Sequence, residues 1–77
     1  MLHELELARL AGEIQREREE RRPGRLHRVR ASTAAYDGAL VDACRTVGIE
    51  HPRGALPWSD ADRYDVEMRL LAAGVHW

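Results

Sequence analysis

The sequence contains no lysine, asparagine or phenylalanine, and all twelve of its basic residues are arginine. Without lysine, neither a Schiff-base nucleophile nor the phosphate-binding lysine of a P-loop is available. Cys44 is the only cysteine, which excludes an internal disulfide and is typical of proteins kept in a reducing compartment. Because no signal-like apolar stretch is present either, these absences predict a cytoplasmic protein.

Long apolar runs are also missing. The longest run spans Leu70 to Ala73, far short of the roughly 20 residues that a membrane-spanning helix requires. A chain of 77 residues buries only about 60% of the surface that its unfolded form exposes. We therefore expect no membrane segment and a single small helical domain over residues 1–77.

A first helix is predicted over residues 3–21. A broad apolar face supports it, formed by Leu2, Leu5, Leu7, Ala8, Leu10, Ala11 and Ile14. Pro23 disfavours helical geometry at the residue before it, and Gly24 lets the chain turn. The apolar face stops at Ile14, so the last two turns of this helix carry charged side chains.

A second helix, over residues 25–47, has the strongest periodicity. Apolar or uncharged residues alternate at spacings of three and four: Leu26, Val29, Thr33, Tyr36, Leu40, Ala43 and Val47. Such a seam is typical of a helix packed lengthwise on others. Gly48 is suited to a left-handed residue that ends the helix, with Ile49 contacting Cys44 in a Schellman motif.

A third helix, over residues 60–73, follows a 49–58 loop. Ser59 is a good N-cap, and Gly74 ends the helix in the same way as Gly48 ends the second. The predicted buried positions are Ala61, Tyr64, Met68, Leu71 and Val75. Trp58 precedes the cap, where an apolar residue often packs on another apolar residue at the fourth position of the helix in a hydrophobic staple. Here the fourth position is Arg63, so the staple is missing.

These elements predict an all-α fold, in which an antiparallel helical hairpin (residues 3–21 and 25–47) carries a third helix packed on it. A turn at Pro23 and Gly24 places residue i near residue 47 − i, so Leu7 should face Leu40.

Signs of catalysis and of metal or cofactor binding are weak. No two of the four histidines are three or four residues apart, and Cys44 has no histidine at ligand spacing. Asp37 and Asp42 lie off the seam, where we expect both carboxylates to be solvated. We therefore predict no catalytic, metal or cofactor site and no enzyme activity.

The arginine-rich segment 16–30 holds seven arginines in fifteen positions. Helical spacing pairs three of them with glutamates, as Glu13–Arg16, Glu17–Arg21 and Glu19–Arg22. Arg25, Arg28 and Arg30 have no such partner. The segment can be a solvated elbow between helices, a surface for an acidic protein, or a nucleic-acid-binding arm.

The candidate interface lies just past the turn. Leu26 and Val29 extend beyond the apolar part of the first helix, and Arg25, Arg28 and Arg30 flank them. Trp58 and Trp77 are further candidate contacts, each either folded onto the domain or exposed to a partner. This pattern predicts a protein–protein interaction module, either a small regulatory or adaptor protein or a homodimer. The alternative is a nucleic-acid-associated accessory protein that uses residues 16–30.

The text "AYDGALVDAC…VGIEHP…LPWSDADRYDVEMRLLAAGVHW", residues 35–77, resembles short uncharacterised helical proteins of high-GC actinobacteria. The resemblance is one of composition as much as of motifs. It implies a helical fold and a GC-rich genome as the source of the lysine-free composition, and it brings no catalytic residue with it.

Overall fold

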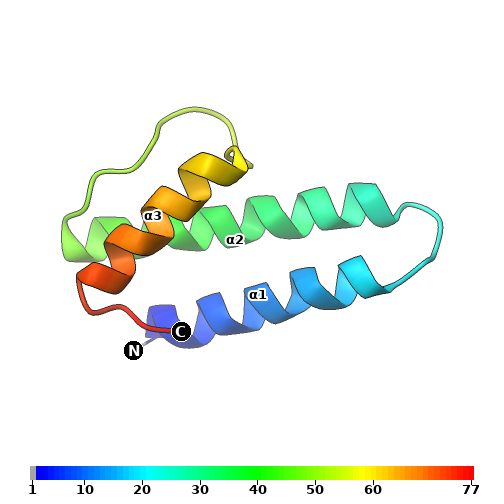
Figure 1. The fold of residues 1–77 in the computed structure, drawn as a ribbon, viewed down its shortest axis with the longest axis horizontal. Helices are drawn as coiled ribbons and strands as arrows, with labels where there is room; N and C mark the ends of the chain where they lie inside the picture. The colour runs from blue at the N-terminus through cyan, green and yellow to red at the C-terminus, as the bar shows by residue number, and fades with distance from the viewer. Residues whose placement is uncertain (1) are drawn as a thin grey trace.

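A computed structural model describes residues 2–77, which form three helices: α1 (Leu2–Glu19), α2 (Arg25–Val47) and α3 (Asp60–Ala72). Helices α1 and α2 form an antiparallel hairpin, and α3 lies across the C-terminal half of α2 (Figure 1). The predicted all-α fold is confirmed, although α1 ends two residues earlier than expected. Within these residues, no helix has the length and apolar character that crossing a membrane requires.

Two cross-helix contacts fix the register of the hairpin. Near the open end, His3 Nε2 lies 2.8 Å from Thr46 Oγ1. Near the turn, the Arg28 guanidinium donates to Glu17 Oε2 over 2.9 Å. Both pairs lie within two residues of the predicted register, and Leu7 and Leu40 are fully buried.

The helix ends follow the predicted local chemistry. Gly48 has a φ of 76°, and the Ile49 N–H donates to the Cys44 carbonyl oxygen over 2.9 Å. The Val75 N–H donates in the same way to the Leu70 carbonyl oxygen over 3.0 Å, after a left-handed Gly74. These are the 6→1 bonds of the Schellman motif. At the start of α3, Ser59 Oγ accepts a hydrogen bond from the Asp62 N–H.

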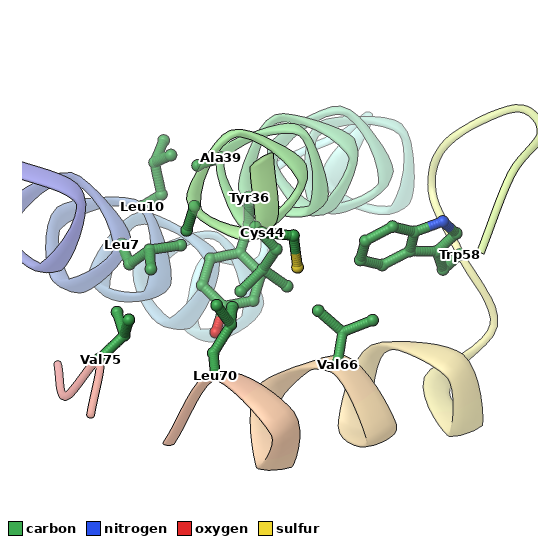
Figure 2. Packing of buried hydrophobic residues seen from close by; sticks show 11 residues of the cluster. Leu7, Leu10, Tyr36, Ala39, Cys44, Trp58, Val66, Leu70 and Val75 are labelled. Carbon is green, nitrogen blue, oxygen red and sulfur yellow. The ribbon is translucent and has the colours of Figure 1, made fainter. Parts of the chain in front are cut away.

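The core lies where α3 covers the hairpin. Side chains from all three helices, the loop and the C-terminal segment meet there (Figure 2). The buried hydrophobic residues are Leu7, Leu10, Tyr36, Ala39, Leu40, Ala43, Cys44, Trp58, Val66, Leu70 and Val75. Helix α1 supplies only two of them, which agrees with the early end of its apolar face.

The buried face of α3 differs from the predicted one. Val66 and Leu70 are buried against α2, whereas Tyr64 is 63% exposed and Met68 is 40% exposed. The prediction for Tyr64, Met68 and Ala61 was therefore wrong. The helix is rotated because Arg63 and Glu67, which share the Val66 side, make polar contacts with residues of α2. A periodicity based on apolar residues alone does not predict a buried face that also contains charged residues.

Candidate functional site

Arg28 makes most of the polar contacts at the turn between α1 and α2. Arg28 binds Glu17 Oε2 and donates through Nη1 to the Pro23 carbonyl oxygen over 2.7 Å. Its Nη2 also lies 3.8 Å from Glu20 Oε2. Arg25 donates to the Arg18 carbonyl oxygen over 3.2 Å. The arginine-rich segment thus contains the polar contacts that close the hairpin.

The three predicted ion pairs within α1 do not form in residues 2–77. Glu13 pairs with Arg9, Glu17 pairs with Arg28, and Glu19 accepts from Gln15. Arg28 has no glutamate at helical spacing, as the sequence indicates, but it finds Glu17 across the hairpin, eleven residues away. Because α1 ends at Glu19, Arg21 and Arg22 do not continue the helix and lose the helical spacing to these glutamates. The antiparallel turn brings Arg28 to Glu17 instead.

An apolar spot remains exposed beside this turn. Leu26 is 79% exposed and Val29 is half-buried, while Arg25 and Arg30 lie on either side of them. Spacings of three and four place these side chains on one face of α2. We call Arg25, Leu26, Val29 and Arg30 the tip patch. The structure therefore places four of the five predicted interface residues near the turn on one face of α2. Arg28 is bound within the hairpin, and Arg25 of the tip patch also donates to the Arg18 carbonyl oxygen of α1.

A groove lies between the three helices, lined by residues of α1, α2 and α3. This groove has a volume of about 230 Å³ and is lined by Ile14, Thr33, Tyr36 and Arg63 among others. The Thr33 hydroxyl donates to the Val29 carbonyl oxygen over 2.7 Å, so it is satisfied within its own helix. The Thr33 hydroxyl on this side of α2 therefore needs no hydrogen-bond acceptor from a partner.

A second exposed apolar surface lies on the outside of α3. It consists of Ala61, Tyr64, Asp65 and Met68, which we call the α3 outer face. Helix α3 carries four carboxylates and two arginines, so this region is acidic. The hairpin end is basic, since residues 13–30 hold seven arginines and four glutamates. The two exposed apolar surfaces therefore lie in regions of opposite charge.

The two tryptophans belong to the fold. Trp58 is only 7% exposed and covers the core from the loop. Trp77 is half-buried, and its indole Nε1 donates to the Tyr36 hydroxyl over 3.1 Å. Trp58 is thus a core residue rather than a surface contact, and Trp77 is folded back onto the domain.

A buried ion pair, which the sequence did not reveal, joins α2, the loop and α3. Asp37 was expected to be solvated, but its side chain is fully buried. Arg63 donates to both carboxylate oxygens of Asp37, over 2.6 Å and 3.0 Å, and the Trp58 N–H donates to Oδ2 over 2.8 Å. The hydrogen bond to Asp37 raises the pKa of Arg63, so this guanidinium stays charged. The sequence signal for this ion pair was Arg63 itself, which stands where a residue that packs on Trp58 is usually apolar.

A second polar chain crosses from α2 to α3. The Tyr36 hydroxyl donates to Glu67 Oε2 over 2.6 Å and accepts from Trp77. Burial, followed by the nearby Glu67 carboxylate, raises the pKa of Tyr36. Its hydroxyl therefore remains protonated and acts as a structural donor.

Cys44 is buried in the core, where burial raises the pKa of its thiol. A buried thiol with a raised pKa is a poor nucleophile. Among residues 2–77, no three histidine, cysteine or acidic side chains come close enough together to hold a metal ion.

The Asp37 carboxylate and the Tyr36 hydroxyl at the centre of the molecule are thus bound by other side chains. Exposed apolar side chains lie on the tip patch, on the α3 outer face and, as Leu2 and Leu5, at the start of α1, and a pocket lies under the loop. No protein family, curated protein or solved structure matches this chain. The resemblance of residues 35–77 to actinobacterial helical proteins stays a prediction.

Proposed function

We propose that this protein is a non-catalytic protein–protein interaction module that associates with a second copy of itself. The observation that supports the proposal is the uncovered half of α2, where Leu26 is 79% exposed within a basic region. In the proposed dimer, the tip patch of each copy docks on the α3 outer face of the other.

The lengths of the helices fit this arrangement. At about 1.5 Å per residue, α2 is about 35 Å long and α3 is about 20 Å long. Helix α3 therefore leaves about 15 Å of α2 uncovered, which is enough for part of a partner helix that crosses α2. In a two-fold dimer, the partner's α3 would lie on this uncovered half, and the same contact would be made twice.

Charge supports the same pairing. The basic hairpin end would meet the acidic α3 region, which favours encounter and fixes orientation. An apolar centre with an arginine rim is a common composition for protein interfaces. The opposite charges lie in different regions of the chain, so two copies can attract each other locally although the net charge of each copy is only −1.

The test is the oligomeric state of the wild type and two variants by sedimentation equilibrium. We expect the wild-type protein to dimerise, Leu26→Glu to be monomeric, and Leu5→Glu to dimerise as the wild type does. Leu5 is a matched control because it is also an exposed leucine, but it lies on α1. A wild-type protein that stays monomeric at about 100 µM, or an unaffected Leu26→Glu variant, would contradict the proposal.

Mixing two variants sharpens the test. Leu26→Glu retains an intact α3 outer face, and Tyr64→Glu retains an intact tip patch. Each variant alone should be monomeric, whereas their mixture should form a heterodimer with one of the two contacts preserved. If the mixture remains monomeric while the wild type dimerises, the tip patch does not pair with the α3 outer face.

Nucleic-acid binding through residues 16–30 remains the alternative. The structure favours it less, because Arg28 is bound to Glu17 and Arg22 is bound to Glu20. Phosphate contacts weaken steeply with salt, whereas an apolar interface does not. Binding to a DNA or RNA duplex that falls by orders of magnitude between 50 and 200 mM salt would support this alternative.

A further inference from the structure

The loop between α2 and α3 stands away from α2 although both of its ends are fixed. At one end, Gly48 and Ile49 close the Schellman motif. At the other end, the Trp58 N–H is bound to the buried Asp37. Figure 1 shows the segment between these points arching away from the helix. A pocket of about 720 Å³ lies between the loop and α2.

One part of the pocket lining is apolar. Val41 of α2 and Ile49 and Leu56 of the loop line it, and all three also pack against the core. Their outer surfaces are only half-buried, so the pocket has an apolar base that is held in place from behind. A volume of this size is within the range of roughly 300–1,000 Å³ that small-molecule sites occupy.

The other part of the lining is cationic. Arg45 of α2 and Arg53 of the loop line the pocket, and neither forms an ion pair with a carboxylate of residues 2–77. Arg16 and Arg30 also lack such a pair, so the distinguishing feature of Arg45 and Arg53 is their position in the pocket lining. Glu50 supplies the one carboxylate of the lining, so the pocket has a net positive charge.

Two ring side chains flank the pocket on the loop side. The His51 ring lines the pocket, and its Nδ1 lies 2.9 Å from the Pro52 carbonyl oxygen. Behind it, the Trp58 indole lies with its ring centroid 6.1 Å from that of His51. Figure 2 shows the indole nitrogen turned toward the loop, and this buried N–H has no acceptor within residues 2–77. This N–H lies behind the His51 ring and not in the pocket lining, so the indole can report on a ligand in the pocket without binding it.

We propose that the loop pocket binds a small organic anion, a carboxylate or a phosphate monoester, through Arg45 and Arg53, with its apolar part on Val41, Ile49 and Leu56. Guanidinium groups bind carboxylate and phosphate oxygens through paired charge-assisted hydrogen bonds. The site is separate from the tip patch and does not depend on the proposed dimer.

The test is a titration of the ¹⁵N-labelled protein followed by two-dimensional NMR. The probes are benzoate, phenyl phosphate, inorganic phosphate and benzyl alcohol. We expect benzoate or phenyl phosphate to shift the Gly54 amide and the Trp58 indole signals in a saturable manner. The Gly12 amide and the Trp77 indole, which lie elsewhere, should not move. Comparing benzoate with phenyl phosphate distinguishes a carboxylate site from a phosphate site.

Variants assign the charge. Arg45→Gln and Arg53→Gln should each weaken binding about fivefold, since each removes a charged but exposed donor. Arg9→Gln, an exposed arginine of α1, should leave binding unchanged. Inorganic phosphate and benzyl alcohol should both bind more weakly than the anion with an apolar ring. Benzyl alcohol binding as tightly as benzoate, or affinity unaffected by both pocket variants, would overturn the proposal.

The same titration with Leu26→Glu separates the two proposals. Binding that persists in this variant is expected, whether or not the wild type dimerises. Loss of saturable binding to every anion in both proteins would contradict the pocket proposal and leave the dimer proposal intact.

Discussion

Residues 36–44 and residues 26–33 of α2 carry the same alternating spacing of three and four, yet only the first set is covered by α3. The covered set includes Tyr36, Leu40 and Ala43, which are all buried. The uncovered set includes the exposed Leu26 and the half-buried Val29 and Thr33. The comparison teaches that a continuous seam shows which side of a helix can pack, while the length of the partner decides how much of it does.

The largest difference between the two halves should come from the buried ion pair. Arg63→Met leaves the fully buried Asp37 without its counter-charge, which should lower the free energy of unfolding by about 3–5 kcal/mol. Because a domain of this size is stabilised by only about 3–5 kcal/mol, the variant should be largely unfolded. Urea titration followed by circular dichroism measures this effect.

Two further variants control that experiment. Arg69→Met, on the exposed side of α3, should change the free energy of unfolding by less than about 1 kcal/mol. The double variant Asp37→Leu/Arg63→Met removes both charges and should recover much of the lost stability. A folded Arg63→Met variant would show that the ion pair does not hold α3 on the hairpin.

Leucine truncation compares the two halves directly. Leu40→Ala should lower the free energy of unfolding by about 2–5 kcal/mol, because it opens a cavity in the covered half. Leu26→Ala should lower it by less than about 0.5 kcal/mol at concentrations where the protein is monomeric. Equal losses in the two variants would show that the hairpin end is covered in the monomer too.

The smallest effect should come from Tyr36→Phe, which removes the link from α2 to Glu67 and Trp77. At neutral pH it should lower the free energy of unfolding by about 1 kcal/mol. Because the pKa of Tyr36 is raised in the folded protein, its stabilisation is complete below the ordinary tyrosine pKa of about 10. Above that pH the unfolded chain loses the proton first, so wild-type stability should fall.

Urea titrations at pH 8 and pH 11 test the pH dependence. The wild type should lose more stability between these two pH values than Tyr36→Phe does. An equal loss in both proteins would assign the alkaline destabilisation to other groups.

Much of the fold follows from local sequence signals. Pro23 and Gly24 predict the turn, Gly48 and Gly74 predict two helix ends, and the spacing around Leu40 predicts the packed face of α2. Each of these depends on the backbone preferences of one residue or on a period of 3.6 residues. Such signals act over short distances, and the structure confirms them.

The orientation of α3 and the status of Asp37 depend on a distant partner. Asp37 and Arg63 are 26 residues apart, and burial of each is possible only because the other neutralises it. A prediction that assigns every charged residue to solvent therefore places Asp37 and Arg63 on the surface. It then orients α3 so that Tyr64 is buried. Similarly, helical spacing predicts partners for the α1 glutamates within their own helix. The contact between Glu17 and Arg28 forms only when the hairpin closes, so local spacing does not predict it.

The position of the aromatic residues has a consequence for spectroscopy. Tyr36, Trp58, Tyr64 and Trp77 all belong to α3, to its flanking segments or to the part of α2 that α3 covers, and residues 2–35 contain no aromatic side chain of this kind. Intrinsic fluorescence therefore reports on one half of the molecule and is silent about the end of the hairpin. Unwinding of the hairpin end would lower the helical ellipticity while the tryptophan emission stayed constant.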